Sequence, residues 1–273
     1  MKGKGTKVTL IAIGVLFIVT MLVIPLITVL VYALRQGFDV FAQAVTNEYA
    51  LKALQLTLLV TVIAVAVNTF FGLFSSWAIT KFRFRGKQIL TTLIDIPFAI
   101  SPVIAGLVFI LVFGRIGWAY DFIQAHDIKI VFAVPGIILA TIFVTFPFVS
   151  RELIPLMQSQ GSDEEEAAAL MGANGFKIYR KITLPHIKWG LLYGVILCTA
   201  RALGEFGAVS VVSGHLRGKT NTLPLHIEIL FNEFHLTEAF AVSSILVVLA
   251  IIILILKNIV EYKGKKAGNE NVR

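Results

Sequence analysis

The chain has 273 residues, of which 57% are hydrophobic and only 15% are charged. This balance excludes an ordinary soluble domain, in which about a quarter of the residues are charged, and indicates an integral membrane protein. The single cysteine, Cys198, excludes an internal disulfide, and the five histidines show no zinc-ligand spacing.

Six apolar stretches are long enough to cross a bilayer as helices, because each crossing needs about 20 helical residues. In chain order they are residues 8–34, 51–79, 89–113, 131–149, 187–212 and 237–256. The first is much longer than the apolar core of a signal peptide and has no cleavage site after it, so we expect it to remain as an anchor. The sequence therefore predicts an all-α membrane protein with six transmembrane helices.

The net charge of +8 reflects the topology of the chain. Most lysines and arginines fall before the first span, between the second and third, between the fourth and fifth, and after the sixth. This positive-inside asymmetry predicts a multi-pass protein of the cell membrane with both termini and the loop 151–186 in the cytoplasm. We therefore expect membrane lipid, and no nucleic acid, as the partner of the basic charge.

The second and third spans carry polar residues or prolines that interrupt their apolar character. Asn68 is alone in the second span, and we expect it to form a hydrogen bond between helices. The third span contains Asp95, Pro97 and Pro102. We expect the prolines to serve helix packing, and Asp95 to reach the headgroups or to cap a helix that restarts at Pro97.

The loop 151–186 is the longest polar segment between spans and contains a predicted helix at 164–171. Ser162 and Glu165 have the spacing of a capping box, and Gly172 is a suitable C-terminal stop. A helix so short and polar needs support from elsewhere. It is either an ordinary surface loop or a docking element for a soluble protein.

The spacing of residues decides between these alternatives. Glu166-Ala167-Ala168 is followed after three residues by Gly172, and after nine more by Ile182 and Leu184-Pro185. This segment resembles the EAA loop of binding-protein-dependent ABC importers, which implies a coupling helix that docks on a separate ATPase. Small alanines permit close approach, and Glu166 offers a charge-assisted contact. The resemblance implies that the ATPase-docking residues are Glu166, Ala167, Ala168, Gly172, Ile182, Leu184 and Pro185.

The fifth predicted span carries Arg201 and Glu205, four residues apart on one predicted helix face. An arginine at mid-span costs roughly 2.5 to 3.5 kcal/mol, so both residues are expected to face other helices or water. Two roles remain open: pairing between helices, or lining a route for an anion. Gly204 and Gly207 would allow close helix contact beside them.

The outer loop after this span contains Gly214, Gly218, Lys219 and Thr220, which resemble a phosphate-binding loop. Only three residues separate the glycines where that motif needs four, so the sequence predicts no nucleotide site in this chain. Arg217 and Lys219 are candidates for outer-face contacts with an anion or a binding protein, and an ordinary solvated loop is the alternative.

Residues 201–208, 211–225 and 227–230 resemble the W-type permeases of sulfate and thiosulfate ABC importers, and the likeness covers about 51–257. It implies a type I importer permease, not an enzyme, with a T-type permease, two ATPase copies that use ATP, and an extracytoplasmic anion-binding protein as partners. The related molybdate and tungstate permeases are the alternative. We divide the chain into an N-terminal helix with its outer loop (1–50), a permease domain (51–257) and a basic tail (258–273).

Two other classes fit the sequence less well. A secondary transporter would show related halves and a mid-membrane carboxylate relay, which we do not find. An intramembrane hydrolase is suggested only by Ser213-Gly214-His215, whose adjacency does not give the geometry of a nucleophile and its base.

Overall fold

The computed structural model describes residues 4–270, which form helices and no strand. This confirms the all-α prediction for the described part of the chain. Lys2 and Arg273, which contribute to the predicted inner-side charge, lie outside these residues. The helices have the following bounds: α1 Lys4–Ile18, α2 Ile24–Leu34, α3 Phe38–Thr46, α4 Glu48–Lys81, α5 Lys87–Ala99, α6 Pro102–Phe113, α7 Tyr120–Ala125, α8 Val134–Thr145, α9 Pro147–Gln160, α10 Asp163–Leu170, α11 Gly175–Ile178, α12 Leu184–Leu203, α13 Gly207–Val212, α14 Leu223–Asn232 and α15 Leu236–Glu270.

Five helical stretches are long and apolar enough to cross a membrane, and one bent pair makes a sixth if it is counted as one span. A π-helical turn, η1 (Val19–Val23), joins α1 to α2, and another, η2 (Tyr179–Thr183), joins α11 to α12. The five stretches are Lys7–Leu34, Glu48–Lys81, Val134–Gln160, Gly175–Leu203 and Leu236–Gly264. The predicted six spans are reached when the bent pair is counted as one span, and two of the predicted spans are broken.

The predicted span 89–113 is two helices rather than one. α5 and α6 meet at 109° across Ile100 and Ser101. Pro102 is the first residue of α6, and a proline disfavours helical backbone in the residue before it; Ser101 accordingly has a ψ of 134°. Pro97, in contrast, lies inside α5 without ending it. The helix thus restarts at Pro102, and the expectation of a restart at Pro97 is wrong.

The predicted span 187–212 is also broken. α12 ends at Leu203 and α13 begins at Gly207, so Arg201 and Glu205 do not share the face of one helix as predicted. Two glycines within four residues weaken the helix here. The carboxylate of Glu205 also accepts a hydrogen bond from the backbone N–H of Ala208 (2.9 Å), which favours a new helix start over continuation.

The core forms where α4, α9 and α12 pack together. A Cβ on Gly72 would lie 2.9 Å from the side chain of Val149, so a glycine is needed where α4 approaches α9. Asn68 donates hydrogen bonds to the hydroxyl of Thr145 (2.8 Å) and the carbonyl of Ile142 (3.1 Å), which confirms the predicted bond between helices. Such a bond contributes about 0.6 kcal/mol within a membrane.

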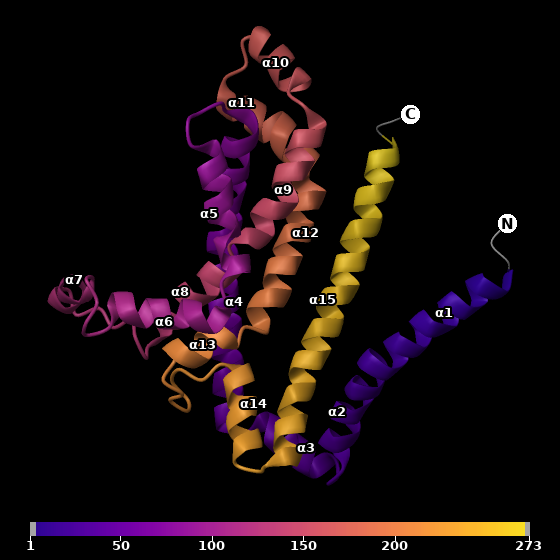
Figure 1. The fold of residues 1–273 in the computed structure, drawn as a ribbon, viewed down its shortest axis with the longest axis vertical. Coiled ribbons are helices and arrows are strands. Elements are labelled where there is room, and N and C mark those ends of the chain that lie inside the picture. Colours follow the sequence, from indigo (N-terminus) through magenta and orange to yellow (C-terminus); the bar gives the residue numbers. More distant parts are fainter. Residues whose placement is uncertain (1–3, 271–273) are drawn as a thin grey trace.

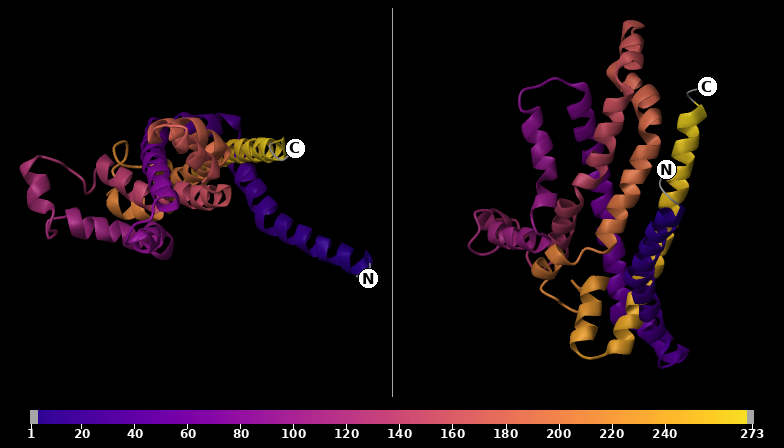
Figure 2. Two further views of the ribbon diagram at one scale, coloured as in Figure 1. Left: turned by 90° about the horizontal axis from the view of Figure 1, so that it is seen from above. Right: turned by 45° about the vertical axis from the view of Figure 1, so that its right-hand side comes forward.

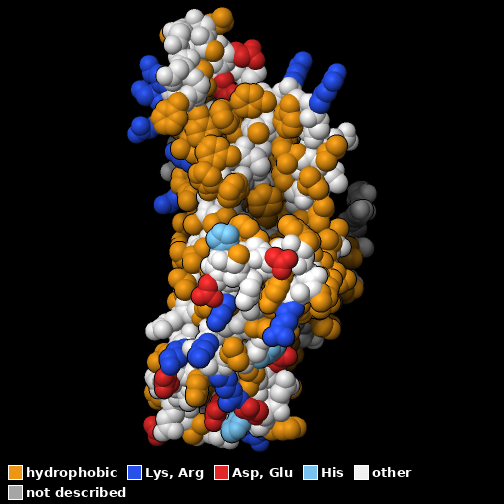
Figure 3. All heavy atoms as spheres, turned by 90° about the vertical axis from the view of Figure 1, so that its left-hand side faces the viewer, with side chains coloured by type: hydrophobic (Ala, Val, Ile, Leu, Met, Phe, Trp, Pro, Cys, Tyr) orange, Lys and Arg blue, Asp and Glu red, His pale blue; other side chains and the backbone are white. Residues whose placement is uncertain are grey.

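The helices give the molecule two distinct ends (Figure 1). α10 and α11 project at one end, and α3 and α14 lie at the other, while α6 and α7 extend to the side. The right-hand view of Figure 2 shows the same elongated arrangement, and the view from above on the left shows α1 splayed away from the other helices. Figure 3, which faces the side that carries α6 and α7, shows hydrophobic side chains over much of the upper half and charged side chains of both signs in the lower half.

Candidate functional site

The first candidate site is α10 with its flanking turns, residues 161–174, which we call the α10 segment. Its C-terminal end is fixed by backbone geometry: the N–H of Gly172 bonds to the carbonyl of Ala169, and the N–H of Ala173 bonds to that of Ala168, both at 3.0 Å. Gly172 has a φ of +83°. This is a Schellman motif, for which glycine is the preferred residue, and the predicted stop at Gly172 is confirmed.

The predicted capping box at the other end is wrong. The side chain of Ser162 makes no cap hydrogen bond and instead donates to the carboxylate of Glu166 (2.5 Å). Glu165 does not return to the backbone of Ser162, because its carboxylate binds Lys81 and Thr183. A charge-assisted contact in a half-buried position outcompetes a cap at the surface. The four acidic residues at positions 163–166 still complement the positive end of the helix dipole.

The α10 segment presents both polar and apolar side chains to its surroundings. No residue of α10 is buried; Glu166 and Ala167 are exposed and Ala168 is half-buried. Three large apolar side chains were missed as candidates: Leu170, Met171 and Phe176 are 90%, 87% and 73% exposed. We call these three the apolar tip. Their signal in the sequence is that they are the large apolar residues of an otherwise polar stretch, and their exposure favours contact with another protein.

The remaining predicted docking residues lie behind α10, in η2 and at the start of α12. Ile182 is half-buried and Pro185 is exposed in the first turn of α12. Leu184 packs against the core formed by Val149, Leu153 and their neighbours. The structure thus places the seven predicted residues in one region, with Leu184 supporting the segment from the inside.

The second candidate site, which we call the broken-span centre, lies where the two interrupted spans meet. α6 packs closely on α13: a Cβ on Gly106 would lie 2.7 Å from the carbonyl oxygen of Ala208, and one on Gly207 would lie 2.9 Å from Pro102. The predicted close contact at Gly207 is confirmed. Gly204 makes no such contact, because a Cβ there would meet only the carbonyl of Ala200 at 3.9 Å.

Arg201 and Glu205 are brought together at this centre despite the break in the helix. The Nη1 atom of Arg201 lies 2.5 Å from Oε2 of Glu205, and the other carboxylate oxygen holds the first turn of α13. The side chain of Glu205 is 1% exposed and that of Arg201 is 32% exposed. The buried carboxylate therefore contacts only its own chain, through an ion pair and one hydrogen bond, while the guanidinium is partly accessible.

The two outer-loop candidates differ in their contacts. Arg217 is exposed and donates a hydrogen bond to the carboxylate of Glu233, and this bond lowers the pKa of Glu233 below its usual range. Lys219 is exposed, and no side-chain partner for its ammonium group is found among residues 4–270. Of the two, Lys219 is the one whose charge is available to a partner.

Comparison with known proteins assigns the family. The model of the binding-protein-dependent transport system inner membrane component matches residues 68–266, which includes the α10 segment and the broken-span centre. The chain belongs to this family. It is an inner-membrane permease component rather than a soluble enzyme.

Relatives of this permease carry more specific names. It is 48% identical to the sulfate transport system permease protein CysW of Escherichia coli K12 over 93% of this chain and 87% of that one. It is 44% identical to CysW of Synechocystis, over 96% and 95%. It is also 33% identical to the CysT permease of Salmonella typhimurium, over 88% and 87%.

The fold is that of a known importer. The permease superimposes on a chain of a bacterial ABC transporter that imports alginate, with a TM-score of 0.78, 16% identity and coverage of 96% and 95%. At this identity the likeness shows the fold alone. It confirms the predicted type I importer architecture.

Proposed function

We propose that this permease is the W-type subunit of an ATP-driven importer that carries sulfate, and that it forms the membrane pathway together with a homologous T-type permease. The observation that carries the proposal is the similarity to CysW proteins along nearly the whole chain, at 44% to 48% identity. The relatives named above are sulfate permeases, and none of them supports the molybdate and tungstate alternative.

ATP is bound and hydrolysed by a separate subunit, present in two copies, and not by this chain. The α10 segment supports this assignment, since an exposed helix with small alanines and an apolar tip has the features of a protein-docking element. The ATPase is cytoplasmic, so α10 lies on the cytoplasmic side. The start of α1 and the end of α15 are directed toward the same end of the molecule as α10 (Figure 1), which supports cytoplasmic termini.

The broken-span centre contributes to the anion pathway through Arg201. Non-helical backbone at membrane depth is tolerated where it is buried in protein or lines a cavity, and here two such breaks adjoin. Glu205 fixes the guanidinium and offsets part of its charge, so an anion is attracted without being held tightly. On the opposite side of the membrane from α10, Lys219 contacts the extracytoplasmic binding protein that delivers the anion.

The test is uptake by the reconstituted complex of this permease, a T-type permease, the ATPase and the binding protein. We expect ATP-dependent uptake of radiolabelled sulfate that unlabelled molybdate and tungstate inhibit only weakly. Uptake in which molybdate or tungstate competes as well as unlabelled sulfate would contradict the assignment of sulfate. Uptake without the ATPase would contradict the importer itself and favour a secondary transporter.

A further inference from the structure

The α10 segment is joined to the rest of the permease at two points where the backbone turns through glycine. Gly161 precedes α10 with a φ of +72°, and Gly172 follows it with a φ of +83°. A Cβ at either position would meet no atom within 4 Å, so no packing surrounds the side-chain side of either glycine. With no buried residue in α10, apolar packing does not hold the helix either. A force applied to α10 would rotate it about these turns unless side chains oppose the rotation.

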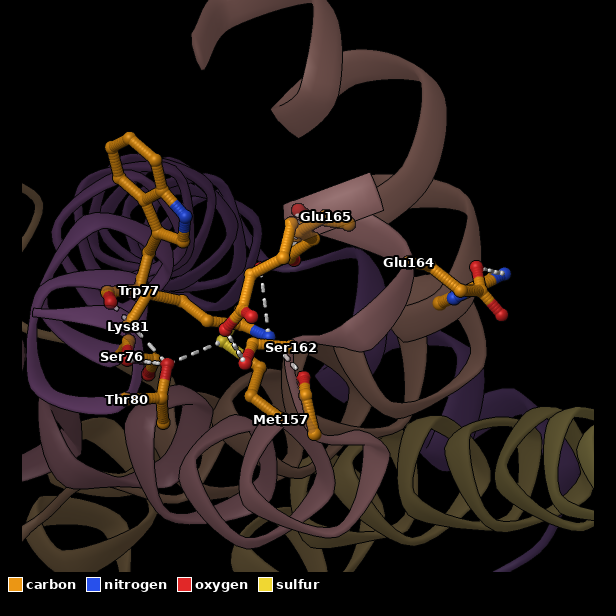
Figure 4. A network of polar contacts seen from close by, with 12 residues as sticks. Ser76, Trp77, Thr80, Lys81, Met157, Ser162, Glu164 and Glu165 are labelled. Atoms are coloured by element: carbon orange, nitrogen blue, oxygen red, sulfur yellow. Dashed lines mark hydrogen bonds and ion pairs between the residues drawn. The ribbon is translucent and has the colours of Figure 1, made fainter. Parts of the chain in front are cut away.

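Two side chains of α10 contact residues beyond the segment: Glu164 lies 3.5 Å from the ring of His186 at the surface, and Glu165 forms the more buried contacts. The carboxylate of Glu165 accepts a hydrogen bond from the hydroxyl of Thr183 (2.6 Å) with one oxygen and pairs with the ammonium of Lys81 (2.9 Å) through the other. The side chains of Lys81 and Glu165 are only 12% and 17% exposed, and Thr183 is buried. Figure 4 shows Glu165 turned toward Lys81, whereas Glu164 points away from this group.

Lys81 makes a second contact, with the backbone of the turn that precedes α10. Its ammonium also donates to the carbonyl of Gly161 (2.5 Å), at the start of the α10 segment. One cation thus binds both the flexible turn before α10 and a carboxylate on α10 itself. Rotation about Gly161 would separate Lys81 from both acceptors at once.

Lys81 is also the last residue of α4, which leads into the core of the permease. The neighbouring Thr80 donates to the sulfur of Met157 in α9 (3.3 Å), and Ser76 lies buried one turn earlier (Figure 4). α4 continues for 34 residues, past the hydrogen bonds of Asn68, toward the opposite end of the molecule. At 1.5 Å per residue, this is a rod of about 50 Å.

We infer that Lys81, Glu165 and Thr183 are positioning residues that lock α10 to the end of α4, so that movement of a docked partner is transmitted to the transmembrane helices. We call this group the α4 lock. The inference rests on the proposed function, because it requires that α10 docks on the ATPase. The inference adds the route by which movement passes from α10 to α4, and it names the residues that transmit this movement.

The test uses the reconstituted complex and measures sulfate uptake per ATP hydrolysed. Lys81→Glu and Glu165→Lys each place like charges together, and each should lower this ratio by at least about fivefold, the lower range of coupling between sites, while ATP hydrolysis continues. The double variant that exchanges the two charges should recover most of the ratio, and Lys81→Arg should retain it. Lys52→Glu is the matched control, because it disrupts the exposed pair with Glu48 at the far end of α4.

Copurification of the ATPase separates failure of the lock from failure of the docking. Unchanged ratios in both single variants, with the ATPase bound, would overturn the lock and leave the docking intact. A ratio of sulfate uptake to ATP hydrolysis that is as low in an assembled double variant as in the single variants would also overturn the lock. If a charge-reversed variant does not assemble, Glu165→Gln and Thr183→Val remove the contacts without repulsion, and an unaltered ratio in both would contradict the inference. An ATPase that never copurifies with the unmodified permease would contradict the proposed function instead.

Discussion

The α10 segment and the broken-span centre are both interruptions in an apolar chain, yet they are built in opposite ways. α10 has no buried residue, it is bounded by glycine turns, and its contacts with the rest of the chain are polar. At the broken-span centre Glu205 is buried, and glycines bring α6 and α13 into contact. The difference indicates that α10 is completed by a partner outside the chain, whereas the broken-span centre is completed by the chain itself. Substitution of the exposed residues of α10 should therefore affect interaction with the partner, whereas substitution of the buried Glu205 should affect integrity.

The largest effect is expected at Glu205. Glu205→Ala leaves Arg201 and the N–H of Ala208 without their acceptor, and loss of one partner of a buried pair costs about 3 kcal/mol. We expect the yield of assembled complex to fall sharply in size-exclusion chromatography. Arg201→Lys, which keeps a cation beside the buried carboxylate while Glu205 still holds α13, should assemble but transport less sulfate. Equal loss of complex in both variants would favour a purely structural pair.

The next largest effect is expected at the apolar tip. Replacing Leu170, Met171 or Phe176 by serine removes apolar area from the proposed interface, and each substitution should weaken binding of the ATPase by up to about tenfold. The assembled permease pair should be unaffected. Leu216→Ser is the matched control, since Leu216 is half-exposed in the outer loop. Equal ATPase affinity in all these variants, measured by titration of the detergent-solubilised permease pair, would remove the apolar tip from the interface.

The contrast between the two regions also explains which features the sequence could reveal. The spacing from Glu166 to Pro185 located the α10 segment, because a docking surface depends on residues close together in the chain. Gly172 was predicted correctly because its positive φ is a local requirement. The partner of Glu165 was not predicted, since Lys81 is distant in the sequence and only tertiary packing brings the two together.

The broken spans were missed for a related reason. Hydropathy is averaged over a window and carries no information on the direction of the helix axis. Residues 89–113 and 187–212 therefore each appear as one apolar segment. The local signals were present in Pro102 and in the glycines around Glu205, but helices within membranes often contain both residue types. The close packing of α6 on α13, which accompanies both breaks, is not visible in either segment alone.

A smaller effect is expected at the end of α10. Gly172→Ala places a Cβ in left-handed backbone and should destabilise the local turn by about 1 kcal/mol. We expect a several-fold lower ratio of sulfate uptake to ATP hydrolysis. Gly175→Ala is the control, because that glycine is equally open but has ordinary backbone geometry. If both variants lowered the ratio alike, the turn at Gly172 would have no special part in coupling.

The smallest effects are expected in the outer loop. Lys219→Ala should slow association with the binding protein by about twofold, and the effect should vanish at high salt. Arg217→Ala should change association less, because Arg217 is engaged with Glu233. The lowered pKa of Glu233 means that this pair is fully charged at neutral pH and is lost only as the pH falls through that value. Stopped-flow association rates at two salt concentrations test the predicted effects of Lys219→Ala and Arg217→Ala. A larger effect of Arg217→Ala would contradict the assignment of Lys219 as the contact for the binding protein.

The most direct test of docking at α10 is a crosslink between the permease and the ATPase. The only native cysteine, Cys198, is buried, so Cys198→Ser provides a background in which Ala167→Cys is the sole thiol of the permease. We expect a short thiol crosslinker to join this position to single cysteines lining the ATPase cleft, with an efficiency that changes when ATP binds. No crosslink from position 167, together with efficient crosslinking from a cysteine in the outer loop, would contradict the account.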